Sequence, residues 1–538
     1  MDTLLQDLRY SFRLLWKKPG FAAIVILTLA LGIGANTAVF TVINALLLRP
    51  LPYPDADRLV FVWESRLSDP AMEDSLSPHN FTDIGQRARS LQSYFAFRYG
   101  TFNLTAGGQP EALSGVLASA DFGRTMGITP AIGRMFGAAE DVPGRDRAVV
   151  LSDGLWKRRF GGDPQILGTQ IRLNGELFSV LGVMPPDFRY PHPDVELWVP
   201  LALDLSKSKR GTSFLTSVAR LKPGVTEEAA SSEALQVGGQ FRKDFPEVGP
   251  DFSLLMEPFR EHLYGKMERP LMILFGSVAL VLLIACVNVA NLMLSRASSR
   301  SKEIAVRSAL GASRASLIRL LLLEGLLLAL LAGAAGILLA AYGIQILTSI
   351  YPAAIPASAN LSMDIRVIGF TVLVSVMTGV LFALAPAWHA AQAGLNQTLQ
   401  ESGRAVSSAR RVKLFRSALV VTEICLSLVL LVGAGLLLKS LWKELAVNPG
   451  FEAQNVVTCM ISLPQSHYGD SSAQTAFFRR ALDAMRDLPG VESAGFATSL
   501  PFSGSRGVSS FSIDGRPDVA GTNGPEADRH QVSPGYFG

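Results

Sequence analysis

The side chains that could carry out catalysis are scattered along this sequence and form no recognisable catalytic motif. Its six histidines are far apart, and neither an H-E-x-x-H motif nor a Cys/His cluster with metal-ligand spacing accompanies them. The G-x-x-x-x-G-K-[ST] loop that cradles nucleotide phosphates is absent, as is the G-x-S-x-G turn of serine hydrolases. We therefore expect no enzyme: no catalytic residue, no metal site and no cofactor.

One charged segment, residues 295–319, has the pattern of a helix that presents a binding surface. Its candidate docking residues are Arg300, Glu303, Arg307, Gly311 and Arg314. At about 100° per residue, the four charged side chains fall within about 60° of arc. Glu303 and Arg307 also have the i,i+4 spacing of a helical ion pair. The surface suits either anionic lipid or a protein partner, and the residues alone leave both readings open.

Four polar residues lie inside otherwise apolar runs. They are Glu324, Glu423, Asn288 and Asn291. An ionisable side chain is costly in hydrocarbon and is a candidate functional group by default. Both glutamates lie roughly 8–10 Å from the end of their run at 1.5 Å per residue, within reach of nearby arginines. We expect helix packing or ion pairing for the glutamates rather than an ion path, and interhelical hydrogen bonds for the asparagines.

The chain that positions these residues is too apolar for a soluble protein. Hydrophobic residues make up 49% of its 538 residues and charged residues 17%, against about 25% charged in average soluble proteins. Five segments reach the roughly 20 apolar residues that a spanning helix needs. They are 21–48, 271–294, 320–347, 367–388 and 417–438. The first is longer than the about 7–15 apolar residues of a signal peptide, so we expect an uncleaved anchor.

Lysine and arginine in the short segments between the spans predict the orientation. They are concentrated in three segments: residues 1–20, which read as an amphipathic helix, the segment 295–319 and the linker 389–416. The outer loop 348–366 contains neither residue type before Arg366. The basic segments, and with them the N-terminus, are therefore expected on the cytoplasmic side. Residues 49–269 and 439–538 are then extracytoplasmic, and a net charge of +4 gives no reason to expect nucleic acid.

The large loop 49–269 has the pattern of a folded α+β domain. A short apolar strand, 149–151, precedes Ser152, which is placed to cap a helix. Alternating apolar and polar residues flank Asn174-Gly175, which predicts a hairpin with a type I′ turn. The fold class is therefore a polytopic α-helical membrane protein with five spans, a large extracytoplasmic α+β domain and the start of a second such domain.

Several stretches taken together resemble one known family. They include “DLRYSFRLLWKKPGFAAIVILTLALGIGANTAVF” at the N-terminus, “VVLSDGLWKRRFGGDP” and “RLKPGVT” in the outer domain, and “SRASSRSKEIAVRSALGASRASLIRLLLLEG” after the second span. The chain resembles the FtsX-like, MacB-like permeases of bacteria, and within them the duplicated orphan permease type of acidobacteria. Residues 439–538 are similar to the first part of a second outer domain, which predicts a duplicated unit and a C-terminally truncated chain.

This resemblance implies a function in the bacterial inner membrane. Such permeases are similar to membrane subunits of type VII ABC systems, in which a separate cytoplasmic ATPase moves the outer domain through the helices, a process called mechanotransmission. It implies ATPase docking at Glu303, Arg307 and Gly311, with Glu324 following in the third span, and efflux or envelope export. It further implies a homodimer, or a pseudo-dimer formed by the duplicated unit.

Two other functions fit the residues. A membrane-anchored adhesion or scaffold protein without ATP coupling would also have a sizeable outer domain and no evident transport path. A proton-coupled carrier would use Glu324 and Glu423 as its proton-binding groups.

Overall fold

The computed structural model describes most of the chain. The described residues are 12–13, 16–105, 109–299, 314–350, 361–392, 405–451, 454–463, 468–501, 508–511, 513–515 and 526–537. Contacts divide the chain into two compact units. One combines Met1–Arg49 with Tyr264–Val456, and the other combines Pro50–Leu263 with Val457–Gly538. The first unit contains the membrane-spanning helices and the second contains the β-sheets.

Among the described residues, five helices are long and apolar enough to cross a membrane, the number that the sequence predicts. They are α2 (Pro19–Ile43, continued by the π-helical turn η1, Asn44–Leu48), α7 (Phe259–Ser299), α9 (Arg314–Ile350), α10 (Ile365–Gln392) and α11 (Ala405–Leu445). Helix α7 begins at Phe259, well before the apolar run, and contains Pro270. Most of residues 1–20 lies outside the described part of the chain.

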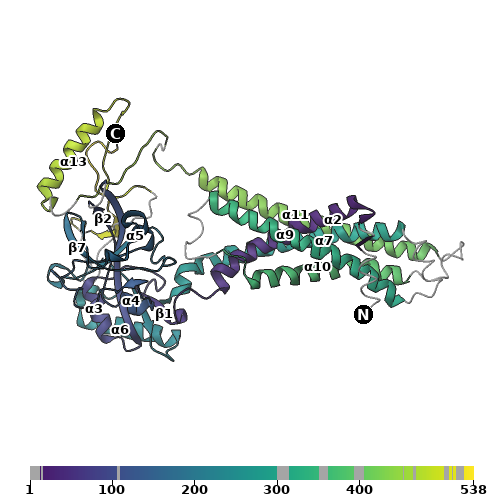
Figure 1. The fold of residues 1–538 in the computed structure, drawn as a ribbon, viewed down its shortest axis with the longest axis horizontal. Helices are drawn as coiled ribbons and strands as arrows, with labels where there is room; N and C mark the ends of the chain where they lie inside the picture. Colours follow the sequence, from purple (N-terminus) through teal and green to yellow (C-terminus); the bar gives the residue numbers. More distant parts are fainter. Residues whose placement is uncertain are drawn as a thin grey trace. The chain divides into compact units, whose positions relative to one another are not determined.

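Four of these helices share one apolar core. Residues of α2, α7, α9 and α10, among them Leu29, Val289, Leu328 and Phe382, are buried together, and the helices run alongside one another in Figure 1. By contrast, the apolar window of α11 contains no buried residue, so this helix presents apolar side chains all round.

Small residues let the backbones of the bundle approach closely. A Cβ added to Gly34 of α2 would lie 3.0 Å from the carbonyl oxygen of Gly336 in α9. On the other side of α9, a Cβ on Gly325 would lie 2.6 Å from the Cβ of Ala383 in α10. Close backbone approach maximises van der Waals contact between helices that gain no hydrophobic free energy from association in lipid. Helix α9 is therefore the centre of the bundle.

The sheet unit contains a large mixed sheet. Its strands follow the order β10-β1-β9-β2-β3-β8-β5-β7-β4, with β6 pairing with β2 and β7. In chain order the strands are β1 (Leu59–Arg66), β2 (Leu91–Leu104), β3 (Glu111–Ala118), β4 (Ile132–Gly133), β5 (Ala148–Leu151), β6 (Gln170–Leu173), β7 (Glu176–Val183), β8 (Leu197–Pro200), β9 (Thr216–Leu221) and β10 (Phe252–Pro258). The β3–β8 and β5–β7 pairs are parallel and the other pairs are antiparallel.

Part of this sheet closes on itself. Because β6 pairs with β7 and also meets β2 at Leu104 and Leu173, strands β2, β3, β8, β5, β7 and β6 form a ring. The ring encloses one apolar core, which includes Phe102, Leu151 and Val180. Closure satisfies the backbone groups that an open edge would leave unpaired.

A second core lies where helices α3 (Pro78–Arg87) and α6 (Glu227–Asp244) pack on strands β10, β1, β9 and β2. Phe241 of α6 and Leu254 of β10 are among its buried residues; α3, α6, β1 and β2 are labelled in Figure 1. Thr226 caps α6 by accepting a hydrogen bond from the Ala229 N–H, which satisfies one of the free amides of the first turn.

The local predictions for this unit are confirmed. Ser152 accepts a hydrogen bond from the Leu155 N–H and caps α5 (Asp153–Phe160). Strands β6 and β7 pair antiparallel across Asn174 and Gly175, whose φ angles of 51° and 85° suit a type I′ turn. The same unit also contains α4 (Phe122–Met126), α13 (Ser471–Arg486) and the paired strands β11 (Val508–Ser510) and β12 (Glu526–Asp528).

The two ends of residues 50–263 lie beside each other. The ring of Tyr53 packs edge-on against that of Phe259, with centroids 5.8 Å apart, and Phe61 stacks on Phe259 at 5.0 Å. The entry and exit of the domain are thus joined by an aromatic cluster.

Candidate functional site

A buried ion pair links α7 to α9. The Arg296 Nη1 lies 2.8 Å from the Glu324 Oε1, and the two side chains are 9% and 3% exposed. On its other side, the Arg296 guanidinium lies 4.4 Å from the centre of the Phe21 ring at the start of α2. Two opposite charges that are desolvated together stabilise each other, whereas either one alone would be costly in this environment.

The sequence around each partner explains this placement. Arg296 lies in the last turn of α7, where the carbonyl end of the helix favours a positive charge. Glu324 precedes Gly325, whose missing side chain lets α10 approach α9. The glutamate is therefore held in a tightly packed seam with an arginine as its partner.

The other polar residues singled out in the apolar runs are less buried. Asn288 and Asn291 are half-buried on α7, and the Asn291 Oδ1 has no hydrogen-bond partner among the described residues. Glu423 is half-buried on α11.

Two polar side chains of α2 that sequence reasoning missed make interhelical hydrogen bonds. The Asn36 Nδ2 donates to the Val278 carbonyl of α7 at 2.8 Å, and the Thr37 hydroxyl lies 3.0 Å from that of Thr371 in α10. Their signal is the polar pair inside the apolar run “GIGANTAVF”.

A second polar cluster lies where η1 meets the start of α10. Asp364 accepts hydrogen bonds from the Arg366 and Val367 N–H groups at 3.0 Å and caps α10. Its other oxygen accepts from the Asn44 Nδ2 at 3.0 Å and lies 3.6 Å from the Arg49 Nη2. The hydrogen bond from the Val367 N–H is the main cause that lowers the pKa of Asp364. This cluster holds α10 to the end of the first span.

Four candidate docking residues lie outside the described part of the chain. They are Arg300, Glu303, Arg307 and Gly311, and Arg314 is the first residue of α9. The segment that contains them joins Ser299, the last residue of α7, to Arg314. The ion pair thus connects the two helices that flank this segment, and the docking role of its residues stays a prediction.

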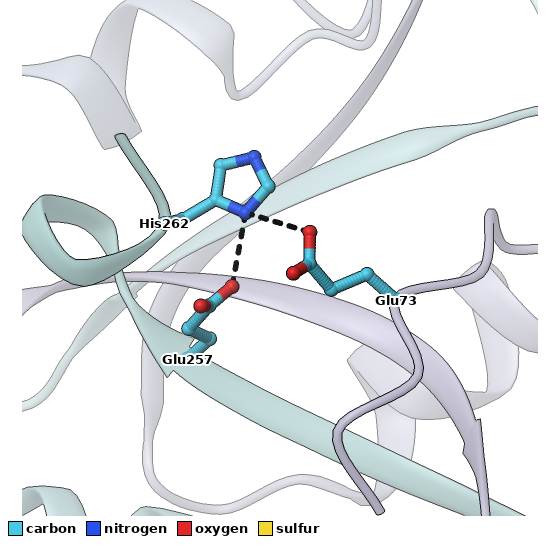
Figure 2. Close-up of side chains that lie close together, drawn as sticks. All are labelled: Glu73, Glu257 and His262. Atoms are coloured by element: carbon cyan, nitrogen blue, oxygen red, sulfur yellow. Dashed lines mark hydrogen bonds and ion pairs between the residues drawn. The ribbon is translucent and has the colours of Figure 1, made fainter. Parts of the chain in front are cut away.

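In the sheet unit, three side chains with metal-ligand chemistry come together. They are Glu73, Glu257 and His262, drawn in Figure 2. Sequence reasoning missed them because Glu73 is far from the other two in the chain.

Two family models match parts of the chain. Residues 22–237 match the model of the MacB-like periplasmic core domain, and residues 275–395 match the FtsX-like permease C-terminal model. The second match includes Arg296, Glu324 and the five candidate docking residues. The chain combines a MacB-like periplasmic core domain with an FtsX-like permease domain. This permease is therefore a multi-pass bacterial membrane protein with a large extracytoplasmic domain, as its sequence predicts.

Curated relatives of this permease are macrolide export ATP-binding/permease proteins MacB. That of Chromobacterium violaceum is 28% identical over 276 residues, covering 51% of this chain and 41% of the relative. That of Hahella chejuensis is 25% identical over 276 residues, covering 50% and 40%. The permease chain thus spans less than half the length of these relatives.

Two solved structures also resemble part of the permease. A domain of a Porphyromonas gingivalis permease is 17% identical, with a TM-score of 0.31, over 38% of this chain and 93% of that one. The periplasmic region of MacB from Actinobacillus actinomycetemcomitans is 15% identical, with a TM-score of 0.30, over 40% and 94%.

Proposed function

We propose that this permease is the membrane subunit of an ABC-type exporter. A separate cytoplasmic ATPase docks on residues 300–314, with Glu303 and Arg307 as the central pair, and drives movement of the extracytoplasmic domain. These 538 residues contain no nucleotide-binding loop, so the proposal places ATP binding outside them. The MacB relatives, whose names combine ATP binding with macrolide export, support efflux as the class of process.

The buried Arg296–Glu324 pair is the observation that carries this proposal. It joins α7 and α9 next to the two ends of the docking segment. A push on that segment would therefore move both helices together, because separating them would leave two charges without partners in apolar surroundings. The backbones of α2 and α10 also approach α9 closely, at Gly34 and Ala383, so movement of α9 would reach both helices.

Helix α7 carries the movement onward in this proposal. It begins at Phe259, directly after the last residue of β10, and continues without a break to Ser299. With the N-terminus and the docking segment in the cytoplasm, ATP-driven displacement at one end of α7 reaches the sheet unit at the other.

Site-specific cross-linking tests the docking step. A photoreactive residue in place of Arg307 in native membranes should capture an ATP-binding protein. The double variant Glu303→Ala, Arg307→Ala should lose the ATPase activity that co-purifies with the wild-type permease. A matched variant, Arg410→Ala, Arg411→Ala, removes charge from the other expected cytoplasmic linker and should keep it. Capture of no ATPase, or equal co-purification in all three proteins, would refute the proposal.

A further inference from the structure

Three potential metal ligands from separate segments converge in the sheet unit. Glu73 lies in the loop between β1 and α3, Glu257 lies near the end of β10, and His262 lies in the first turn of α7. The His262 Nδ1 is 2.9 Å from the Glu257 Oε2 and 3.2 Å from the Glu73 Oε2. Figure 2 shows both carboxylates directed at this one ring nitrogen. The three ligand atoms lie within 4.8 Å of one another.

The charges of this cluster favour a divalent cation. The two carboxylates leave the cluster with a net negative charge even if the imidazole carries a proton, and like charges at this separation repel each other. The Nδ1–H of a neutral ring can be shared between the carboxylates but cannot offset their charge. A divalent cation would neutralise both carboxylates and accept the nitrogen lone pair at the same time.

The spacing and the donor types indicate which cation. Zinc binds histidine nitrogen and carboxylate oxygen at about 2.0–2.2 Å in tetrahedral geometry, which puts neighbouring ligand atoms about 3.4 Å apart. The observed 2.9 and 3.2 Å are within a few tenths of an ångström of that spacing. Calcium and magnesium prefer all-oxygen sites, whereas an imidazole ligand suits zinc and its neighbours.

Aromatic neighbours hold the His262 ring in place, and the cluster stays open to solvent. The His262 ring packs against Phe61 and Trp63, with centroids 4.2 and 5.2 Å away. Trp63 is 7% exposed, and its Nε1 has no acceptor among the described residues. The three ligand side chains are 17–23% exposed, so an ion can reach them from solvent.

We propose that Glu73, Glu257 and His262 bind a divalent cation of the zinc class, with water as the remaining ligand. The ion ties the loop before α3, the end of β10 and the first turn of α7 to one another. Glu73, Glu257 and His262 all belong to the sheet unit and none is a candidate docking residue, so this proposal does not rest on ATPase docking.

Metal binding to the full chain in detergent tests this proposal. After chelator treatment, wild-type protein should take up one zinc ion per chain, measured by elemental analysis and by competition with a chromophoric chelator. Cobalt as a probe should give the visible absorption of a tetrahedral site with a nitrogen ligand. His262→Ala and Glu257→Gln should each weaken zinc binding by at least about tenfold, since the loss of even an outer-sphere partner costs that much.

The control is His192→Ala, because His192 lies beside a single carboxylate, with its Nδ1 3.3 Å from Asp194. This variant should bind zinc as the wild type does. Zinc should also raise the unfolding temperature of the wild type and the control, and not that of His262→Ala. Absence of a bound ion in the wild type, or equal zinc affinity in the wild type and His262→Ala, would overturn the proposal and leave the cluster as a hydrogen-bonded triad.

Discussion

The carboxyl group of Glu64 in β1 provides a quantitative test of the electrostatics of the sheet unit. One of its oxygens accepts hydrogen bonds from the Ser77 N–H at 3.0 Å and the Asn80 Nδ2 at 2.8 Å. Its other oxygen lies 3.5 Å from the Ser213 hydroxyl. Burial outweighs these hydrogen bonds and raises the pKa of Glu64 from 4.5 to about 7. Replacement by Gln keeps the shape, lets the amide oxygen accept both hydrogen bonds and removes the charge.

The sign and size of the effect follow from this shift. Because the folded domain binds the Glu64 proton more tightly than the unfolded chain, the stabilisation is fully present below pH 4.5 and is lost as the pH rises to about 7. At about 1.4 kcal/mol per pKa unit, ionisation of Glu64 lowers the free energy of unfolding of the wild type at pH 8 by about 3 kcal/mol. Glu64→Gln does not ionise and keeps this stability. The variant should therefore be more stable than the wild type at pH 8 by up to this amount. At pH 5 the difference should fall below about 1 kcal/mol.

Thermal unfolding followed by tryptophan fluorescence measures this difference, since Trp63 adjoins Glu64 in β1. Glu228→Gln is the matched control: Glu228 lies in the first turn of α6, where hydrogen bonds to backbone N–H and to Thr226 lower its pKa. That variant should not be stabilised at pH 8. A loss of stability in Glu64→Gln at pH 8 would show that the hydrogen bonds to the carboxylate outweigh the cost of its burial, which would refute the reasoning.

Two further predictions concern the helix bundle. Arg296→Leu alone should destabilise it by about 3–5 kcal/mol, because the Glu324 carboxylate stays buried without its arginine, whereas adding Glu324→Leu should recover most of the loss. Equal unfolding temperatures of the single and double variants would contradict this. Gly325→Leu should cost at least about 1–3 kcal/mol, since its Cβ would lie 2.6 Å from that of Ala383. Gly343→Leu, which meets open space, should unfold like the wild type, and similar losses in both would argue against a close α9–α10 seam.

The sequence was sufficient for features that depend on neighbouring residues. Apolar run length predicted five spans, and a turn dipeptide and a capping serine predicted the hairpin at Asn174-Gly175 and the start of α5. Each of these signals arises within a few residues of chain. The segment before Pro270 was not predicted as part of α7, because its polar residues end the apolar run although the helix continues through them.

Contacts between segments that are far apart in the chain could not be predicted from patterns of neighbouring residues. The ring of strands closes through β2 and β6, and no local pattern specifies that pairing. For Glu324, the sequence indicated an arginine partner without showing which one, since that depends on how α7 packs on α9. The cluster of Glu73, Glu257 and His262 was hidden for the same reason, because each ligand alone is an ordinary surface residue type.

The contact between Tyr53 and Phe259 has a consequence for how such a chain can evolve. The first and last residues of the domain lie beside each other. The two helices that flank it in the chain, α2 and α7, are joined by the hydrogen bond from Asn36 to Val278. A segment with adjacent ends can be lengthened, exchanged or replaced by a short loop without requiring the two spans to move apart. The outer domain can therefore be exchanged in evolution while the helix bundle is kept, so that similar bundles carry different outer domains.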